Sequence, residues 1–366
     1  MLYLLYEYFY DPDSIFSVLR LFRYLTFRII YAMVTALLIA FFLGPIIIRK
    51  LRLNSIKDEP RSEIDMVNPS QKYGTPTMGG ILILISALVP ILLWCNIFNP
   101  FVQITVFSII WFAALGIKDD LIKVRKKVKD GMSKTEKLFW QALFGLILGI
   151  LMVSPYSPIG WQSASSINIP FYKYPLNIGW FYIPFVVLVI MATSNAVNFA
   201  DGLDGLAIGP SIMVAMVFGI FAYVIGNLNL AKYFQFRFTN GTGELSVLCA
   251  AFIGAGIGFL WFNSYPAQVF MGDTGSLMIG GVMGTVAVLV KQEVLLIIAG
   301  MVFVMEAASV FIQMISINFA GRRLFFMAPI HHTFQKRGIA EPKVVIRFWI
   351  IAAIFALIAL STLKVR

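Results

Sequence analysis

Long apolar stretches alternate with short polar ones along almost the whole chain. Each apolar stretch is close to the roughly twenty residues that an α-helix needs to cross a bilayer. The apolar windows lie at about residues 24–48, 77–95, 100–117, 136–153, 180–200, 206–225, 245–262, 275–290, 294–318 and 344–362. The pattern predicts an all-α, polytopic membrane protein with about ten transmembrane helices.

The composition agrees with a membrane protein and excludes a soluble globular domain. Of the 366 residues, 59% are hydrophobic and 13% are charged, and the mean hydropathy is +0.84. Cys95 and Cys249 both lie in apolar windows, which disfavours a disulfide framework or a thiolate metal site. No internal repeat, low-complexity segment or cleavable signal pattern is visible, so residues 1–366 are expected to form one membrane domain inserted through its first spanning helix.

The distribution of positive charge predicts the orientation in the membrane. The chain has 29 Lys and Arg residues and a formal net charge of +11. Loops 49–76, 118–137 and 319–347 carry six, eight and six of these residues, which makes twenty of the 29, and all three loops fall on one side of the membrane. By the positive-inside rule this side is cytoplasmic, so both termini are expected in the periplasm. Topology thus explains the charge and argues against a nucleic-acid partner.

A polar, glycine-containing stretch, NAVNFADGLDGL from residue 195 to 206, separates two apolar windows. Asn195, Asn198 and Asp201 recur at every third position, so they are predicted to share one face of a helix end, with Asp204 three residues further on. A turn between two helices is the simplest explanation of such residues. Because a charged carboxylate costs roughly 3 kcal/mol at the bilayer centre, the alternative is an interfacial or water-lined site that carries chemistry.

Two further acidic clusters fall on the same cytoplasmic side. Asp119 and Asp120 end the third window and are followed by the most basic loop, so they are either a solvated helix end or a site. Because neighbouring helix residues point about 100° apart, one carboxylate can bind a metal while the other takes a proton or positions a group. Asp273, in NSYPAQVFMGDTGS, begins the eighth window, where it is expected to be a helix N-cap or a Mg²⁺ ligand. Phe270 offers an aromatic face for a flat ring.

The entry to the second window reads KYGTPTMGG and contains Lys72 and Thr77. Backbone N–H groups at a helix start, next to a lysine, form a plausible anion site. The same Gly-Thr-Pro sequence is also a common helix start, so this motif alone is weak.

The two histidines of the chain, His331 and His332, are adjacent and lie between Arg323 and Lys336. A histidine pair is often incidental, but cationic neighbours on a cytoplasmic loop favour phosphate contact or proton transfer. Zinc is disfavoured, because no cysteine is nearby and the acidic residues resemble a magnesium site.

Glu306 is an acidic residue inside the ninth window, with Ser309 and Gln313 on the same helical stripe. Acidic residues inside a span almost always face other protein groups rather than lipid. We expect Glu306 to hydrogen-bond to a neighbouring helix in a structural role.

Together these residues favour one reaction class. Aspartates, histidines and cations gather on one membrane face beside long apolar helices. This arrangement suits a soluble substrate that carries a diphosphate, Mg²⁺ to bridge its phosphates, and an acceptor whose tail stays in the membrane lipid. Phosphoryl transfer depends mostly on positioning and charge neutralisation, which these groups supply.

The same motifs carry a resemblance over essentially the whole chain. GTPTMGG, the paired aspartates after the third window, NAVN and DGLDGLA, VFMGDTGSL, MAPIHH and the C-terminal EPKVVIRFWI and STLKVR occur in order. The chain resembles the phospho-N-acetylmuramoyl-pentapeptide-transferase family of the polyprenyl-phosphate N-acetylhexosamine-1-phosphate transferase superfamily. The resemblance implies ten transmembrane helices, a homodimer in the bacterial inner membrane, and a site that faces the cytoplasm. It also implies transfer of phospho-MurNAc-pentapeptide from UDP-MurNAc-pentapeptide to undecaprenyl phosphate with Mg²⁺, giving lipid I and UMP.

The resemblance also implies roles for individual residues. Asp273 is the expected Mg²⁺ ligand, and the expected catalytic residues are Asp119, Asp120, Asp201, Asp273, His331 and His332. The expected substrate-binding residues are Lys72, Thr77, Asn195, Asn198, Asp204, Asn263, Phe270 and Lys123. Within that set, Asp204, Asn263 and Phe270 are expected to hold the uridine. The resemblance does not fix which aspartate, if any, deprotonates the lipid phosphate.

The chain departs from the family pattern in three places. Thr333 stands where a third histidine is usual, Phe199 and Ala200 replace a common Leu-Thr pair, and Pro69 stands where a histidine is frequent. These changes leave the chemistry intact and affect the expected sugar and phosphate contacts.

Two other functions would also use acidic residues in a helical membrane protein. A transferase that uses UDP-N-acetylglucosamine is disfavoured by GTPTMGG and by the C-terminal motif. A secondary transporter would place its acidic residues near the midplane within paired repeats, and no repeat is visible here.

Overall fold

The computed structural model describes residues 1–11, 15–53, 74–126, 131–160, 165–172 and 174–364. Lys72 and Pro69 lie outside the described residues. The long helices are α2 (Leu25–Leu53), α4 (Gly80–Trp94), α5 (Pro100–Lys126), α6 (Lys134–Val153), α8 (Tyr182–Ala200), α9 (Ile208–Ile225), α11 (Glu244–Asn263), α12 (Gly272–Leu289), α14 (Met301–Ala320) and α16 (Glu341–Ser361). The short helices are α1 (Leu2–Phe9), α10 (Leu228–Tyr233), α13 (Leu295–Ala299), α15 (Ile330–Lys336) and two 3₁₀ helices, Ile15–Arg23 and Gly179–Phe181.

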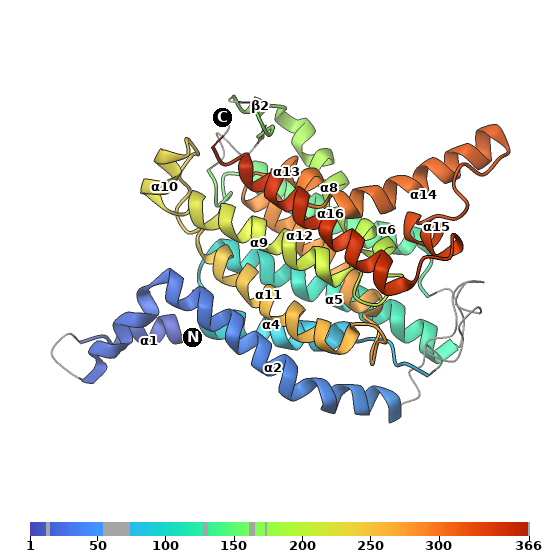
Figure 1. Ribbon diagram of the computed structural model, residues 1–366. Helices are drawn as coiled ribbons and strands as arrows, with labels where there is room; N and C mark the ends of the chain where they lie inside the picture. Colours follow the sequence, from blue (N-terminus) through green and yellow to red (C-terminus); the bar gives the residue numbers. More distant parts are fainter. Residues whose placement is uncertain (12–14, 54–73, 127–130, 161–164, 173, 365–366) are drawn as a thin grey trace.

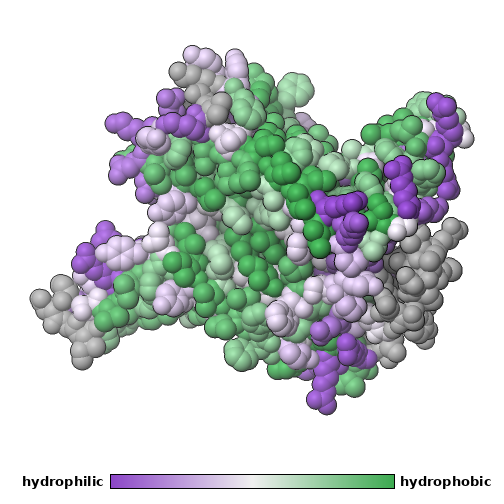
Figure 2. Space-filling view, viewed as in Figure 1, coloured by the Kyte–Doolittle hydropathy of each residue, from purple (hydrophilic) through white to green (hydrophobic). Residues whose placement is uncertain are grey.

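Within the described residues, nine helices are long and apolar enough to cross a membrane. The additional helix α4 is apolar but has only 15 residues. The prediction of a helical, polytopic membrane protein is therefore confirmed, and the tenth span stays a prediction. Figure 2 shows apolar side chains covering most of the visible face, with hydrophilic groups gathered near α10 at one end and near α14 and α15 at the other.

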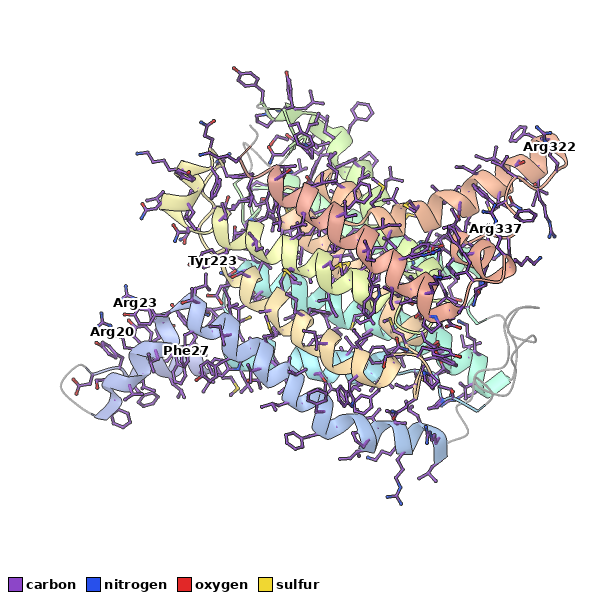
Figure 3. All side chains as sticks on the ribbon, in the orientation of Figure 1. Arg20, Arg23, Phe27, Tyr223, Arg322 and Arg337 are labelled. Carbon is purple, nitrogen blue, oxygen red and sulfur yellow. The ribbon has the colours of Figure 1, made fainter. Side chains whose placement is uncertain are left out.

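Both marked chain ends in Figure 1 lie at the end of the bundle opposite to α15. Figure 3 shows Arg20 and Arg23 toward one end, and Arg322 and Arg337 at the other. Arginines thus lie near both ends of an apolar bundle, as expected where long cationic side chains reach the membrane interfaces.

Helix α12 is the centre of the bundle (Figure 1), and 94% of its spanning window is buried. It packs against α5, α8 and α4. A helix that other helices surround can be apolar on all sides, which explains why α12 is mostly apolar after its polar first turn.

Glycines let α4 and α5 approach the first turn of α12 by their backbones. A Cβ atom at Gly80 would lie 2.1 Å from the backbone nitrogen of Gly275, and one at Gly116 would lie 2.3 Å from the carbonyl oxygen of Asp273. Any larger residue at these positions would push the helices apart. The N-terminus of α12 is therefore fixed against both neighbours, and the polar residues near it are held in place.

Two predicted helix boundaries are wrong. Helix α5 continues to Lys126, so Asp119 and Asp120 lie inside the helix rather than at its end. The reason is that Lys123, one turn later, pairs with Asp119 at 2.6 Å and neutralises its charge. The ninth window is not one helix, because Gly300 interrupts it between α13 and α14.

The region between α6 and α8 contains a short hairpin among its described residues. Strands β1 (Ser166–Ile167) and β2 (Leu176–Asn177) pair antiparallel, with Ser166 opposite Asn177. This pairing fixes the entry to α8 without contributing ionisable groups.

Candidate active site

Three predicted aspartates meet in one buried cluster, which we call the aspartate cluster: Asp119 and Asp120 on α5 and Asp273 on α12. One carboxylate oxygen from each lies within 4.8 Å of the others. The three residues are only 1%, 1% and 3% exposed. Although neighbouring helix residues point in different directions, the first turn of α12 packs closely against α5 at Gly116 and brings Asp273 near both carboxylates.

Two lysines bridge the cluster. The Nζ atom of Lys123 lies 2.6 Å from Asp119 Oδ2 and 3.1 Å from Asp273 Oδ2. The Nζ atom of Lys137, on α6, lies 2.6 Å from Asp273 Oδ2 and 3.2 Å from Asp119 Oδ1. Each ammonium group therefore contacts carboxylates from two helices. Three ionised carboxylates and two ammonium groups leave one negative charge uncompensated among these five side chains.

Lys137 was not among the predicted site residues. It was counted only as one of the eight cations in the basic loop 118–137. The structure places it in the first turn of α6, 16% exposed at its side chain, facing the aspartate cluster. The available signal was that Lys137 lies inside the apolar window 136–153, whereas Lys134 precedes it.

Asp120 has a different set of partners from Asp119. Its Oδ1 accepts a hydrogen bond from the backbone N–H of Asp273 at 3.1 Å, and its Oδ2 accepts from the backbone N–H and the hydroxyl of Thr274 at 2.9 and 2.7 Å. These bonds satisfy N–H groups at the start of α12 that have no partner within that helix. Asp120 therefore performs the capping role that was one alternative for Asp273, and the Asp273 carboxylate is left facing the lysines.

A buried hydroxyl lies next to the cluster. Thr77 Oγ1 is buried and has no hydrogen-bond partner among the described residues. A Cβ atom added at Gly272 would lie 2.9 Å from this hydroxyl and 2.8 Å from Asp120 Oδ2, and Gly272 has a φ of +71°. Glycine is therefore required for the close approach of Thr77 to the aspartates. An unsatisfied buried hydroxyl is costly, so its position favours a polar ligand.

Asp204 and Asn263 connect the loop that follows α8 with the loop that follows α11. Asp204 Oδ2 accepts a hydrogen bond from the backbone N–H of Ala267 at 3.0 Å, and Asn263 Oδ1 accepts from the N–H of Gly205 at 3.0 Å. The Asn263 amide also donates to the carbonyl of Val269 at 2.9 Å. These two side chains thus shape the loop that carries the half-buried Phe270.

The two asparagines of the 195–206 stretch face different helices. The Asn195 amide donates to Gln141 Oε1 on α6 at 2.7 Å, whereas Asn198 Oδ1 accepts from the Ser276 hydroxyl on α12 at 3.1 Å. The predicted shared face is therefore correct in spacing but divided between two neighbours. Asp201 is half-buried just after α8 ends at Ala200.

The histidine pair divides into a buried and a half-buried residue. His331 is 0% exposed, and its Nδ1 lies 3.1 Å from Glu306 Oε2. His332 is half-buried, and its Nδ1 lies 2.9 Å from Gln335 Oε1 on its own helix. The expected bond from Glu306 to a neighbouring helix is thus confirmed, and its partner is a predicted site residue.

Thr333 closes the loop before α15. Its hydroxyl donates to the carbonyl oxygen of Met327 at 2.5 Å and accepts from the backbone N–H of Met327 at 3.3 Å. At 6% exposed, this side chain has a local structural role. The contacts of Thr333 therefore explain its presence where the family usually has a third histidine.

Replacing this hydroxyl should therefore change stability more than activity. We expect Thr333→Val to lower the free energy of unfolding by about 1 kcal/mol, because the Met327 carbonyl and N–H lose their partner. The rate of UMP release should fall by less than about tenfold. Thermal unfolding in detergent checks this, with Thr26→Val at an exposed site as the control. A loss of activity without a loss of stability would assign Thr333 to the chemistry.

Known proteins resemble the chain over its full length. Residues 102–291 match the family model described as glycosyl transferase family 4, and residues 72–84 match the one described as phospho-N-acetylmuramoyl-pentapeptide-transferase signature 1. Proteins named phospho-N-acetylmuramoyl-pentapeptide-transferase from Citrifermentans bemidjiense, Geobacter sp. (strain M21) and Pelobacter propionicus are 49%, 49% and 47% identical to it. Each similarity covers 99% of this chain and 100% of the relative. The two matched ranges contain the whole aspartate cluster and Thr77.

Proposed function

The chain belongs to the phospho-N-acetylmuramoyl-pentapeptide-transferase family, and we propose that its aspartate cluster is the site of a Mg²⁺-dependent phosphoglycosyl transfer. The reaction moves phospho-MurNAc-pentapeptide from UDP-MurNAc-pentapeptide to undecaprenyl phosphate and forms lipid I in peptidoglycan synthesis. An oxygen of the lipid phosphate attacks the phosphorus that carries the sugar. The bond from that phosphorus to the bridging oxygen breaks, and UMP leaves. This proposal rests on one observation: three carboxylates and two lysine ammonium groups lie in contact in one buried cluster.

The donor set of the cluster fits Mg²⁺. Carboxylate oxygens are the ligands that Mg²⁺ prefers, and it usually binds one or two of them while substrate phosphates and water complete its shell. The uncompensated negative charge of the cluster favours a cation, and the unsatisfied Thr77 hydroxyl lies beside it. Asp273, together with Asp119, would hold the ion. When bound, Mg²⁺ would neutralise charge on the diphosphate oxygens.

Lys123 and Lys137 are suited to bind the transferred phosphate. Both ammonium groups reach the cluster from the cytoplasmic side of their helices, and both are partly exposed, at 23% and 16% of their side chains. Because each contacts two carboxylates, an ammonium group can release one of them and still remain neutralised while it contacts a phosphate oxygen. These lysines therefore orient the phosphate and offset its charge.

The uridine is proposed to bind at the loop shaped by Asp204 and Asn263, with its ring against Phe270. We expect Phe270→Ala to raise the KM for the UDP substrate by about tenfold, because loss of aromatic stacking removes roughly 1 kcal/mol or more. The KM for undecaprenyl phosphate should change little. Steady-state kinetics with each substrate varied checks this, and Phe171→Ala in the outside loop is the matched control. An equal rise in both KM values would contradict stacking at Phe270.

The proposed setting is the bacterial cytoplasmic membrane, with the site on the cytoplasmic face, both termini in the periplasm and ten spans that include the short α4. Twenty of the 29 Lys and Arg residues lie in the three loops on the side of the site, which supports this orientation. The two ends of the chain lie at the opposite end of the bundle (Figure 1), as this orientation requires. A homodimer is proposed on the resemblance to the family alone.

One assay on the purified protein tests the proposed reaction. UMP release is measured with UDP-MurNAc-pentapeptide or UDP-N-acetylglucosamine, each with and without undecaprenyl phosphate and with EDTA. We expect release with the muramoyl substrate only, dependent on the lipid and abolished by EDTA. Release with the glucosamine substrate would assign the chain to the related transferases. No release with either substrate would favour a transport or binding function instead.

A further inference from the structure

Glu306 and His331 form a buried pair near the bundle end that carries the site. Glu306 lies on α14 and His331 on α15, and both are 0% exposed. The His331 Nδ1 atom lies 3.1 Å from Glu306 Oε2. No Lys or Arg lies within ion-pair distance of Glu306 in the described part of the chain. A carboxylate buried within a spanning helix costs several kcal/mol unless it is paired, so its presence calls for a reason beyond packing.

The carboxylate determines which nitrogen of the ring carries the proton. An ionised carboxylate only accepts hydrogen bonds, so the nitrogen that faces it, Nδ1, must be the donor. In a neutral ring, Nε2 then carries a lone pair and is free to accept a proton. In proteins, a carboxylate that accepts a hydrogen bond from one ring nitrogen of a histidine commonly selects one tautomer and one ring orientation.

The second nitrogen points at the loop that follows α8. His331 Nε2 is buried and has no hydrogen-bond partner among the described residues. A Cβ atom added at Gly202 would lie 2.4 Å from it, so the ring occupies space that only a glycine leaves. Gly202 itself is exposed and follows Asp201 directly. A buried and unsatisfied imidazole nitrogen at an exposed glycine favours a polar ligand that enters from the loop side.

We propose that Glu306 is a positioning residue that holds His331 with Nε2 directed toward a phosphate monoester bound at the Gly202 loop. The inference rests on the proposed function, in which the acceptor is a lipid phosphate. When that phosphate still carries one proton, its O–H bond breaks and an N–H bond forms at Nε2. The products are a phosphate dianion and an imidazolium whose Nε2–H donates a charge-assisted hydrogen bond to it. His331 therefore presents the acceptor phosphate in its more nucleophilic form.

The pair has an observable signature because the chain contains only two histidines. Protein labelled with ¹⁵N-histidine and embedded in lipid nanodiscs gives signals from two rings, and His332→Gln assigns them. We expect the His331 ring to carry its proton on Nδ1 in the absence of ligand. Addition of undecaprenyl phosphate should convert its Nε2 signal to the protonated form. Glu306→Gln should give a mixture of tautomers, because an amide can donate or accept toward Nδ1.

The kinetic result expected for Glu306→Gln is a loss of about 10²-fold in kcat/KM for undecaprenyl phosphate. The KM for the UDP substrate should not change. Ser309→Ala is the matched control, because its hydroxyl is buried on the same stripe of α14 and, among the described residues, bonds only to the carbonyl of Glu306. It should keep both the tautomer and the activity.

A wild-type His331 ring with its proton on Nε2 would overturn the proposal, and so would an unchanged tautomer and activity in Glu306→Gln. If Glu306→Gln does not fold, the spectrum of the wild-type protein with and without undecaprenyl phosphate still decides. The two proposals fail separately. A wild-type protein that releases no UMP refutes the proposed function, whereas normal UMP release in the wild type and in Glu306→Gln refutes only the positioning role.

Discussion

Asp273→Asn should reduce UMP release by about 10³-fold or more while leaving the fold intact. Asp273 Oδ2 accepts from Lys123 at 3.1 Å and from Lys137 at 2.6 Å, and its carboxylate is the proposed principal ligand of Mg²⁺. The asparagine has nearly the same shape, so packing against Gly116 is preserved. The substitution removes one of the negative charges with which the cluster binds the cation and the two lysines. It therefore weakens binding of both the ion and the phosphate-orienting lysines.

The measurement is the rate of UMP release over a range of Mg²⁺ concentrations, together with thermal unfolding of each protein. Glu136→Gln is the matched control, because Glu136 precedes Lys137 on α6 and forms a partly exposed ion pair with Lys118 at 2.6 Å. Such pairs contribute about 0–1 kcal/mol, so this variant should retain activity. Full activity in Asp273→Asn at any Mg²⁺ concentration would remove Asp273 from the site.

Asp119 and Asp120 should give opposite results when each is changed to asparagine. Asp119→Asn should lower kcat by about 10²–10³-fold with little change in stability, because its oxygens face two ammonium groups and the N–H of Met132 at 2.8 Å. Asp120→Asn should lower the free energy of unfolding by roughly 1–3 kcal/mol, because an amide offers one acceptor oxygen to groups that bond to two. These results would assign Asp119 to the chemistry and Asp120 to the support of α12.

The two variants are compared by thermal unfolding and by kcat at saturating substrate. Each serves as the control for the other, since the residues are adjacent on α5 and equally buried. A stable and inactive Asp120→Asn, together with an active and destabilised Asp119→Asn, would reverse the assignment.

The sequence was sufficient to find the aspartates. A charged residue at the end of an apolar window is unusual, so Asp119, Asp120 and Asp273 could be selected from hydropathy alone. The length of the apolar windows also indicated the nine helices that are long enough to span a membrane among the described residues, because a bilayer imposes that length. The family resemblance then implied the expected roles of these residues.

The contacts between helices could not be predicted in the same way. Lys137 and Asp273 are separated by 136 positions in the chain, and their contact depends on how α6 packs against α12. Asn195 and Asn198 have the spacing of one face, but α8 lies between α6 and α12, so each asparagine bonds to a different neighbour. Close approaches such as Gly80 to Gly275 leave no trace in hydropathy, although they decide where the site forms.

Helix boundaries failed where charges are neutralised within the fold. Asp119 and Asp120 looked like the end of a span because isolated carboxylates avoid the membrane, yet Lys123 lets α5 continue to Lys126. Gly300 had the opposite effect, since it divides an apolar window that has no charged interruption. In α5, ion pairing overrides the tendency of carboxylates to end a spanning helix. At Gly300, the low helix propensity of glycine interrupts the helix.

The most direct test of the central claim is the position of the metal ion. Crystals soaked with Mn²⁺ in place of Mg²⁺, and with UMP, are measured at a wavelength where manganese scatters anomalously. The account predicts one strong peak at the aspartate cluster, in contact with Asp273, and the loss of that peak in Asp273→Asn. A peak at another place in the chain, in a protein whose UMP release depends on the metal, would contradict it.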